Sequence, residues 1–103
     1  MTKLIKVQKA KDEIKRLQHY INLVESYEVN SLERWIIKEY AYTNSIIEVV
    51  RRANIQKLTY EGLPLDKKFA TAVLKAKATD ELHLIMQRGY KHRIKMNKGR
   101  PLR

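Results

Sequence analysis

Apolar residues near the start of the chain recur at alternating steps of three and four, which is the spacing of one face of a long α-helix. The series comprises Val7, Ala10, Ile14, Leu17, Ile21 and Val24. We therefore expect a long amphipathic helix over residues 1–28. Because the series spans fewer than four heptads, it fits two arrangements equally well: packing on the rest of the same domain, or a homodimer through this helix.

Helix-starting signals occur next at residues 30–33. Asn30, with Glu33 three residues later, forms a capping box that predicts a second helix beginning near Ser31. Apolar residues then continue with helical spacing to about residue 54. Periodicity alone would therefore give a single helix over residues 31–54.

Residues 43–45 can interrupt that helix. All three favour caps and turns, and Ser45 with Glu48 makes a second capping box. This pattern favours a break followed by a short helix over residues 46–54, and the two helices would form a helix-turn-helix. A continuous helix or a simple αα-hairpin is the alternative.

A helix-turn-helix would present the first exposed side chains of its second helix to base edges in the major groove. The outward candidates are Asn44, Ser45, Glu48, Arg51 and Arg52. Asn suits adenine, Arg suits guanine, and Glu accepts from cytosine. These residues are therefore the candidates for reading a DNA sequence.

Residues 59–66 are the clearest loop candidate, because Gly62 and Pro64 interrupt helical continuation. Asp66 can then cap a helix over residues 67–77. That helix is expected to bury Phe69, Val73 and Ala76.

Thr79 is expected to cap the last helix, which should end near Asn97. No segment alternates apolar and polar residues over the length of a strand, so we predict an all-α fold. The expected architecture is a small bundle of four to five helices in one domain over residues 1–97, followed by a flexible basic tail over residues 98–103.

The predicted last helix has two contrasting faces. A helical projection places Leu82, Ile85, Met86, Tyr90 and Ile94 on one side. On the opposite side it places Arg88, Lys91, His92 and Lys95. The apolar face is predicted to pack in the hydrophobic core. The basic face predicts contacts to successive phosphates, which release counterions as they form, and a solvated face is the alternative.

Positive charge is concentrated toward the two ends of the chain. The formal net charge is +11, with +4 in residues 1–18, zero in residues 19–87 and +7 in residues 88–103. Interspersed charges of both signs would be enough for solubility, so this distribution indicates a polyanionic partner. Nucleic acid is the first candidate.

The tail contains a Gly-Arg-Pro core flanked by basic residues, at Lys98, Gly99, Arg100 and Pro101. This pattern resembles the AT-hook, and the resemblance implies an arm that lies in the narrow minor groove of A·T-rich DNA. Lys98 stands where the AT-hook has Arg, and the residues after Pro101 depart from its repeated basic pattern. A disordered basic tail that contacts phosphates is the alternative interpretation.

Residue combinations that carry catalysis are scarce. The chain has no Cys, and its His residues at positions 19, 83 and 92 lack the spacing of metal ligands. No phosphate-binding loop or nucleophile elbow is present. We therefore expect no enzyme activity, cofactor, metal or small-molecule substrate. The first residues do not resemble a signal peptide and no apolar run is long enough to span a bilayer, which predicts a cytoplasmic protein with no membrane partner.

These patterns predict a DNA-binding protein that acts without catalysis, as a small bacterial or bacteriophage transcription regulator or as a nucleoprotein accessory factor. Abundant Lys and Ile fit an A·T-rich genome. Two other classes of function fit the same charge distribution: a helical protein-interaction module that binds an acidic partner protein, and an RNA-binding protein. Salt-dependent binding to duplex DNA, and competition with structured RNA, separate the three.

Overall fold

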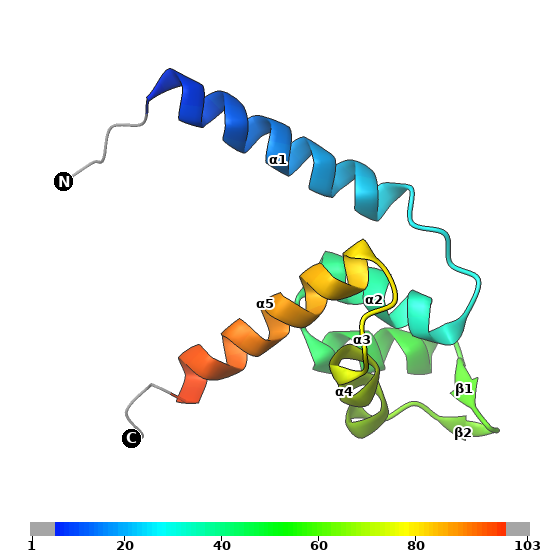
Figure 1. Ribbon diagram of the computed structural model, residues 1–103. Helices are drawn as coiled ribbons and strands as arrows, with labels where there is room; N and C mark the ends of the chain where they lie inside the picture. The colour runs from blue at the N-terminus through cyan, green and yellow to red at the C-terminus, as the bar shows by residue number, and fades with distance from the viewer. Residues whose placement is uncertain (1–5, 99–103) are drawn as a thin grey trace.

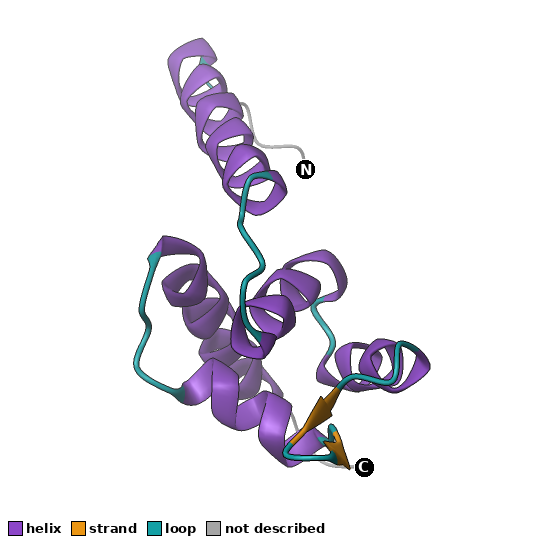
Figure 2. Cartoon of the chain, turned by 90° about the vertical axis from the view of Figure 1, so that its right-hand side faces the viewer, coloured by secondary structure: helices purple, strands orange, loops and turns teal. Residues whose placement is uncertain are grey.

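Five α-helices and one short β-hairpin make up the described part of the chain, in a computed structural model that covers residues 6–98 and the side chains of residues 6–96. In chain order the elements are α1 (Val7–Glu25), α2 (Leu32–Thr43), α3 (Ile46–Ile55), β1 (Thr59–Tyr60), β2 (Leu63–Pro64), α4 (Lys67–Lys75) and α5 (Glu81–Lys98). Helices α2 to α5 pack together as a helical body, and α1 leads away from it (Figures 1 and 2). The predicted all-α fold is confirmed, with the hairpin as an addition.

The core lies where the four helices of the body meet. Its fully buried side chains come from all four helices, and the largest are Ile36, Ile37, Val49, Leu74 and Leu82. On α5, Leu82 and Met86 are buried and Tyr90 is half-buried, as the projection predicted. The projection did not predict that His83 and Gln87 are buried with them.

The break between α2 and α3 is confirmed, and the single continuous helix is wrong. Asn44 ends α2 in the left-handed conformation, with φ 51°, which Asn tolerates better than most residues. Ser45 then starts α3, and its Oγ accepts a hydrogen bond from the Glu48 amide at 3.2 Å. At the start of α2 the cap is Ser31, not Asn30, because Ser31 has the extended backbone that lets its Oγ reach the Arg34 amide.

Residues 59–66, predicted as a loop, contain a two-stranded antiparallel hairpin in which Tyr60 pairs with Leu63. Its two-residue turn, Glu61 and Gly62, has positive φ at both positions, 51° and 80°. That geometry matches the right-handed twist of a hairpin. The Tyr60 ring lies against Phe69 at a centroid distance of 4.5 Å, which attaches the hairpin to α4.

Side chains of α5 bind the last carbonyl groups of α4. Gln87 Nε2 donates to the carbonyl of Leu74 at 2.9 Å and to that of Ala76 at 2.5 Å. His83 Nε2 donates to the carbonyl of Val73 at 3.0 Å. Because these carbonyls have partners outside α4, the helix ends at residue 75, before the predicted residue 77, and Ala76 is exposed instead of buried.

Asp80 caps α5, where the sequence predicted Thr79. Asp80 Oδ1 accepts from the backbone amide of His83 at 2.8 Å, the third-residue contact of an N-cap. The hydroxyl of Thr79 instead donates to Asp80 at 3.5 Å. A carboxylate is also the better match for the positive end of the helix dipole.

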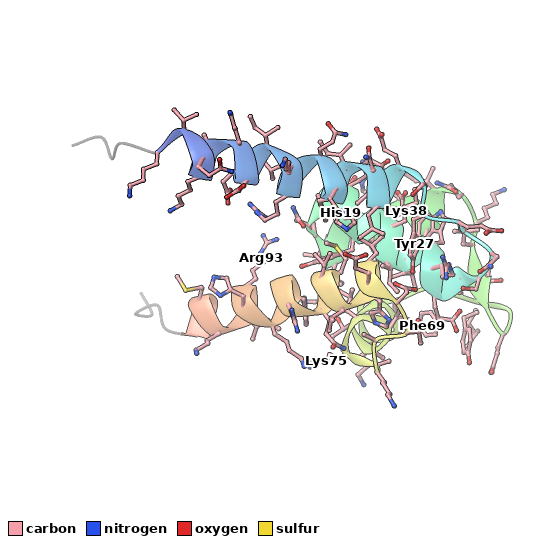
Figure 3. The ribbon with its side chains drawn as sticks, turned by 45° about the horizontal axis from the view of Figure 1, so that its top comes forward. His19, Tyr27, Lys38, Phe69, Lys75 and Arg93 are labelled. Atoms are coloured by element: carbon pink, nitrogen blue, oxygen red, sulfur yellow. The ribbon has the colours of Figure 1, made fainter. Side chains whose placement is uncertain are left out.

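Only the C-terminal part of α1 contacts the helical body. Val24 is buried there, and His19 Nε2 lies 2.8 Å from Glu81 Oε2 at the start of α5. Lys38 Nζ on α2 donates to the carbonyl of Tyr27, just beyond the end of α1, at 3.1 Å. Figure 3 shows His19, Tyr27 and Lys38 where α1 approaches the body.

A polar network around Asp80 connects the segment after α1 to α2 and α5. The Tyr27 hydroxyl donates to Asp80 Oδ2 at 2.7 Å, and Arg34 Nη1 lies 3.5 Å from the same oxygen. The Arg34 guanidinium also lies over the Tyr27 ring, 4.2 Å from its centroid. Burial and the Asp80 carboxylate raise the pKa of Tyr27 to about 12, so its hydroxyl stays protonated and remains a donor.

The network predicts a specific acid sensitivity. Burial raises the pKa of Asp80, but the hydrogen bonds from the His83 amide and the Tyr27 hydroxyl, together with the Arg34 charge, outweigh it and hold the pKa below its usual value. A carboxyl whose folded-state pKa is depressed stabilises the fold above its unfolded-state pKa, about 3.9, and this contribution is lost as pH falls through the folded-state value.

Asp80→Asn should therefore lower the free energy of unfolding at pH 7 by roughly 1–2 kcal/mol and flatten its decline below about pH 4. Urea denaturation at a series of pH values measures both effects. Asp12→Asn is the matched control, because Asp12 is exposed on α1 and accepts only from Gln8 in the described structure. Equal pH profiles for the two variants would contradict the claim that the Asp80 network causes the acid sensitivity.

Candidate nucleic-acid interface

Three adjoining surface hollows surround Tyr90, which lines all of them. We call this surface the basic groove. Its basic side chains are Lys67, Lys68 and Lys75 from α4 and Lys91, Arg93 and Lys95 from α5. No Asp or Glu of the described side chains lines the three hollows. The groove therefore presents charge of one sign over the junction of two helices.

Local sequence explains how α4 presents its lysines. Asp66 Oδ1 accepts from the Phe69 amide at 2.8 Å and starts the helix, so Lys67 and Lys68 fall in its first turn. Lys75 follows Lys68 by seven residues, which is two helical turns, and the two lysines share a face. Buried side chains such as Leu74 occupy the opposite face.

Tyr90 gives the groove an aromatic centre. One side of its ring packs edge-on against Tyr40 of α2, with centroids 6.2 Å apart at 75°. Tyr90 is half-buried and its remaining surface lines the groove. On either side of this ring α5 places Lys91 and Arg93. The ring is therefore both a core residue and part of the surface.

Three acidic side chains of the body, Glu39, Glu48 and Asp80, are paired with arginines, and none of them lines the groove. Asp80 lies by Arg34, and Glu39 Oε1 lies 3.1 Å from Arg52 Nη1. Among the side chains of residues 6–96, none of the groove's five lysines forms an ion pair. Their charge is not compensated locally, so the groove is the place where this fold can attract a polyanion.

The turn between α2 and α3 adjoins the groove. Asn44 and Ser45 line the same hollow as Tyr90, and Arg93 donates from α5 to the carbonyl of Asn44. This contact fixes the turn against α5. Figure 3 shows Arg93 and Lys75 on opposite sides of α5. The first residues of α3 therefore begin at the edge of the basic groove.

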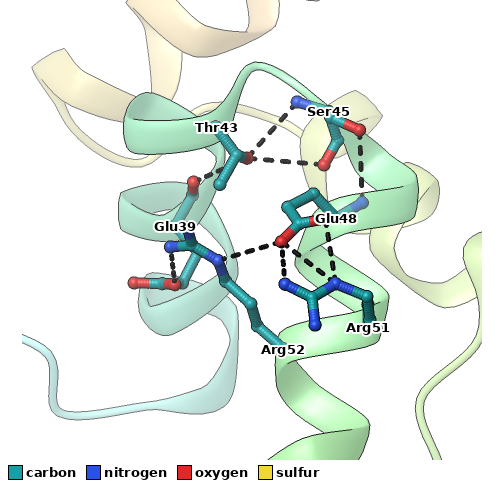
Figure 4. Close-up of polar contacts among 6 residues, drawn as sticks. All are labelled: Glu39, Thr43, Ser45, Glu48, Arg51 and Arg52. Carbon is teal, nitrogen blue, oxygen red and sulfur yellow. Dashed lines mark hydrogen bonds and ion pairs between the residues drawn. The ribbon is translucent and has the colours of Figure 1, made fainter.

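The Glu48 carboxylate binds Arg51 and Arg52, the two arginines that the sequence predicted as base readers (Figure 4). It accepts from Arg51 Nε at 3.0 Å and lies 3.5 Å from Arg52 Nε. The hydrogen bond from Arg51 lowers the pKa of Glu48, so the pair stays ionised at neutral pH. The capping box is only half formed, because the Ser45 amide donates to Thr43 Oγ1 at 3.3 Å and not to Glu48.

The remaining predicted contact residues divide into two sets. Lys91 and Lys95 line the groove, whereas Arg88 and His92 are exposed on α5 but line none of the three hollows. The AT-hook-like segment with Arg100 lies outside the described residues, and of Lys98 only the backbone, in the last turn of α5, is described.

Sequence reasoning missed the three α4 lysines. A helical projection of residues 67–75 would have placed Lys68 and Lys75 on one face, opposite Ala70 and Val73. The zero net charge of residues 19–87 concealed them, because this sum combines the α4 lysines with acids that line none of the three hollows.

Within residues 6–98, no three His, Asp or Glu side chains come together as a metal-binding group. In the same span, no helix has the length and apolar character needed to cross a membrane. Comparisons with protein-family models, curated proteins and solved structures give no match to this chain.

Proposed function

We propose that this protein binds duplex DNA through the basic groove and the α2–α3 helix-turn-helix, by binding alone and without catalysis. The observation that carries the proposal is the continuity of the two features. Six basic side chains and no acid surround Tyr90, and the same surface reaches the start of α3 at Asn44 and Ser45. Phosphate-contacting and base-reading groups would thus lie side by side, as duplex recognition requires.

In this proposal α3 enters the major groove while the lysines of α4 and α5 hold the flanking phosphates. The side chains exposed along one face of α3 are Ile47, Arg51 and Asn54. Asn suits adenine, Arg suits guanine, and an apolar side chain suits the thymine methyl group. Asn54 and Ile47 extend the set predicted from the sequence.

The proposed setting is the cytoplasm of a bacterium, or of a cell infected by a bacteriophage, where the protein would regulate transcription or assist a nucleoprotein complex. Two copies joined through α1 would present two α3 helices to one DNA site. A dimer of this kind recognises two half-sites, which raises both affinity and specificity.

A fluorescence anisotropy titration with generic duplex DNA tests the proposal. If the groove's five lysines each contact one phosphate, log K should fall against log salt with a slope of about −4.5, a loss of roughly 500-fold between 50 and 200 mM salt. No binding at about 50 mM salt would overturn the proposal. Tighter binding to structured RNA, or to an acidic polypeptide, would assign the groove to that partner instead.

Releasing Arg51 of α3 should strengthen DNA binding. Glu48→Gln removes the carboxylate that holds Arg51, so this guanidinium becomes available to DNA, whereas Arg52 keeps its ion pair with Glu39. We expect roughly threefold to tenfold tighter binding to generic duplex DNA, equivalent to about 0.7–1.4 kcal/mol. Glu33→Gln, at an exposed position on α2, makes the same change in net charge and should have a smaller effect. Equal gains in affinity would show that net charge alone is responsible.

A further inference from the structure

Most of the apolar face of α1 has no partner among the described side chains of residues 6–96. Val7, Ile14, Leu17 and Ile21 are 71%, 67%, 48% and 46% exposed, and of the predicted seam only Val24 is buried. We call these four exposed residues the α1 stripe. The alternative that this face packs on its own domain is therefore wrong for all but its last turn. Large apolar side chains aligned on one helix face are typical of an interaction surface.

The stripe leads into a hollow between α1 and α2. Its lining is mostly apolar, with one acid, and comprises Tyr20, Ile21, Val24, Glu25, Ala41 and Tyr42. Tyr42 is 56% exposed at its rim. The stripe and the hollow form one continuous surface, because Ile21 belongs to both.

Charge along α1 is polarised. Residues 6–16 contain five Lys or Arg against two acids, whereas residues 17–25 contain Glu25 and no Lys or Arg. A parallel pair of α1 helices would place the two lysine-rich ends side by side, which is unfavourable. An antiparallel pair places the lysine-rich end of each helix level with the glutamate-bearing end of the other.

We infer that a second copy of this chain covers the stripe, with the two α1 helices antiparallel. The seam residues alternate between heptad positions a and d, and in an antiparallel pair each a position faces a d position of the other helix. Ile14 then lies opposite Leu17 of the second copy, and Ala10 lies opposite its Ile21. Val7 then comes level with Val24 of the second copy and enters the hollow between α1 and α2 of that copy. Lys6 comes level with Glu25. The pair is closed by a two-fold axis, so it does not extend into a filament.

This inference rests on the proposed homodimer and is independent of nucleic-acid binding. The chain has no Cys, so only cysteines introduced by substitution can form a disulfide. Ala10→Cys and Ile21→Cys are made as separate full-length variants and oxidised alone or mixed. An antiparallel pair predicts a cross-linked dimer only in the mixture. In each variant alone the two Cys lie about 16 Å apart along the helices, beyond disulfide reach.

Cross-linking of either variant alone would indicate a parallel pair and overturn the inference, as would the absence of cross-linking in the mixture. Sedimentation velocity gives an independent test. Leu17→Asp should convert a dimer into a monomer, while Asn22→Asp, which adds the same charge off the stripe, should not. If wild type is monomeric at about 100 μM but binds duplex DNA, only this inference fails. An antiparallel dimer that does not bind DNA would overturn the proposed function alone.

Discussion

Replacing Lys75, Lys91 and Lys95 together by Gln should weaken binding to generic duplex DNA by two to three orders of magnitude at about 0.1 M salt. The three lysines line one hollow beside Tyr90, where α4 meets α5. Each phosphate contact contributes about 0.9 to the slope of log K against log salt, so the triple variant should also show a slope shallower by about 2.7. Anisotropy titrations at four salt concentrations measure both changes.

Lys9, Lys11 and Lys15 provide the matched control. They are exposed on α1, away from the groove, and their replacement by Gln removes the same three charges. We expect a change of no more than a few fold and an almost unchanged salt slope. If the two triple variants weaken DNA binding equally, affinity for DNA depends on the net charge of the protein and the basic groove is not the binding surface.

Leu74→Ala should destabilise the fold more than Asp80→Asn does. Leu74 is fully buried on α4, between the groove lysines and the rest of the core. Removing its side chain leaves a cavity, which costs about 2–5 kcal/mol. In a domain of this size a loss of about 3 kcal/mol lowers the melting temperature by roughly 10–20 °C. Urea denaturation followed by circular dichroism gives the change in unfolding free energy.

Leu63→Ala is the control for that measurement. Leu63 lies in the hairpin and is 69% exposed, so the same truncation should change stability by less than about 0.5 kcal/mol. Similar losses from the two variants would mean that α4 does not pack as described, and the groove between α4 and α5 would then lack its base.

Features that depend on neighbouring residues were predictable from the sequence. The break at residues 43–45 follows from three neighbouring turn-forming residues, the last of which, Ser45, caps α3. The division of α5 into an apolar and a basic face follows from helical spacing in the same way. Errors at this level were small: Ser31 caps in place of Asn30, and Asp80 in place of Thr79.

Features that join distant segments were not predictable. Lys75 belongs to a stretch of zero net charge, yet it lies beside Lys91 and Lys95 because α5 packs on α4. Gln87 and His83 join α5 to α4 through hydrogen bonds to α4 carbonyl groups, and nothing in the sequence indicated that these two side chains are buried. The spacing on α1 correctly predicted an amphipathic helix but gave no indication whether its own body would cover the apolar face.

Lysine footprinting tests the central claim, that the basic groove is the surface that binds DNA. The protein is acetylated with and without saturating generic duplex DNA, and the modification of each lysine is quantified by mass spectrometry. We predict that DNA protects Lys67, Lys68, Lys75, Lys91 and Lys95, while Lys9, Lys11 and Lys15 react as they do in the free protein. Protection confined to the α1 lysines, or bound DNA that leaves the groove lysines reactive, would contradict this claim.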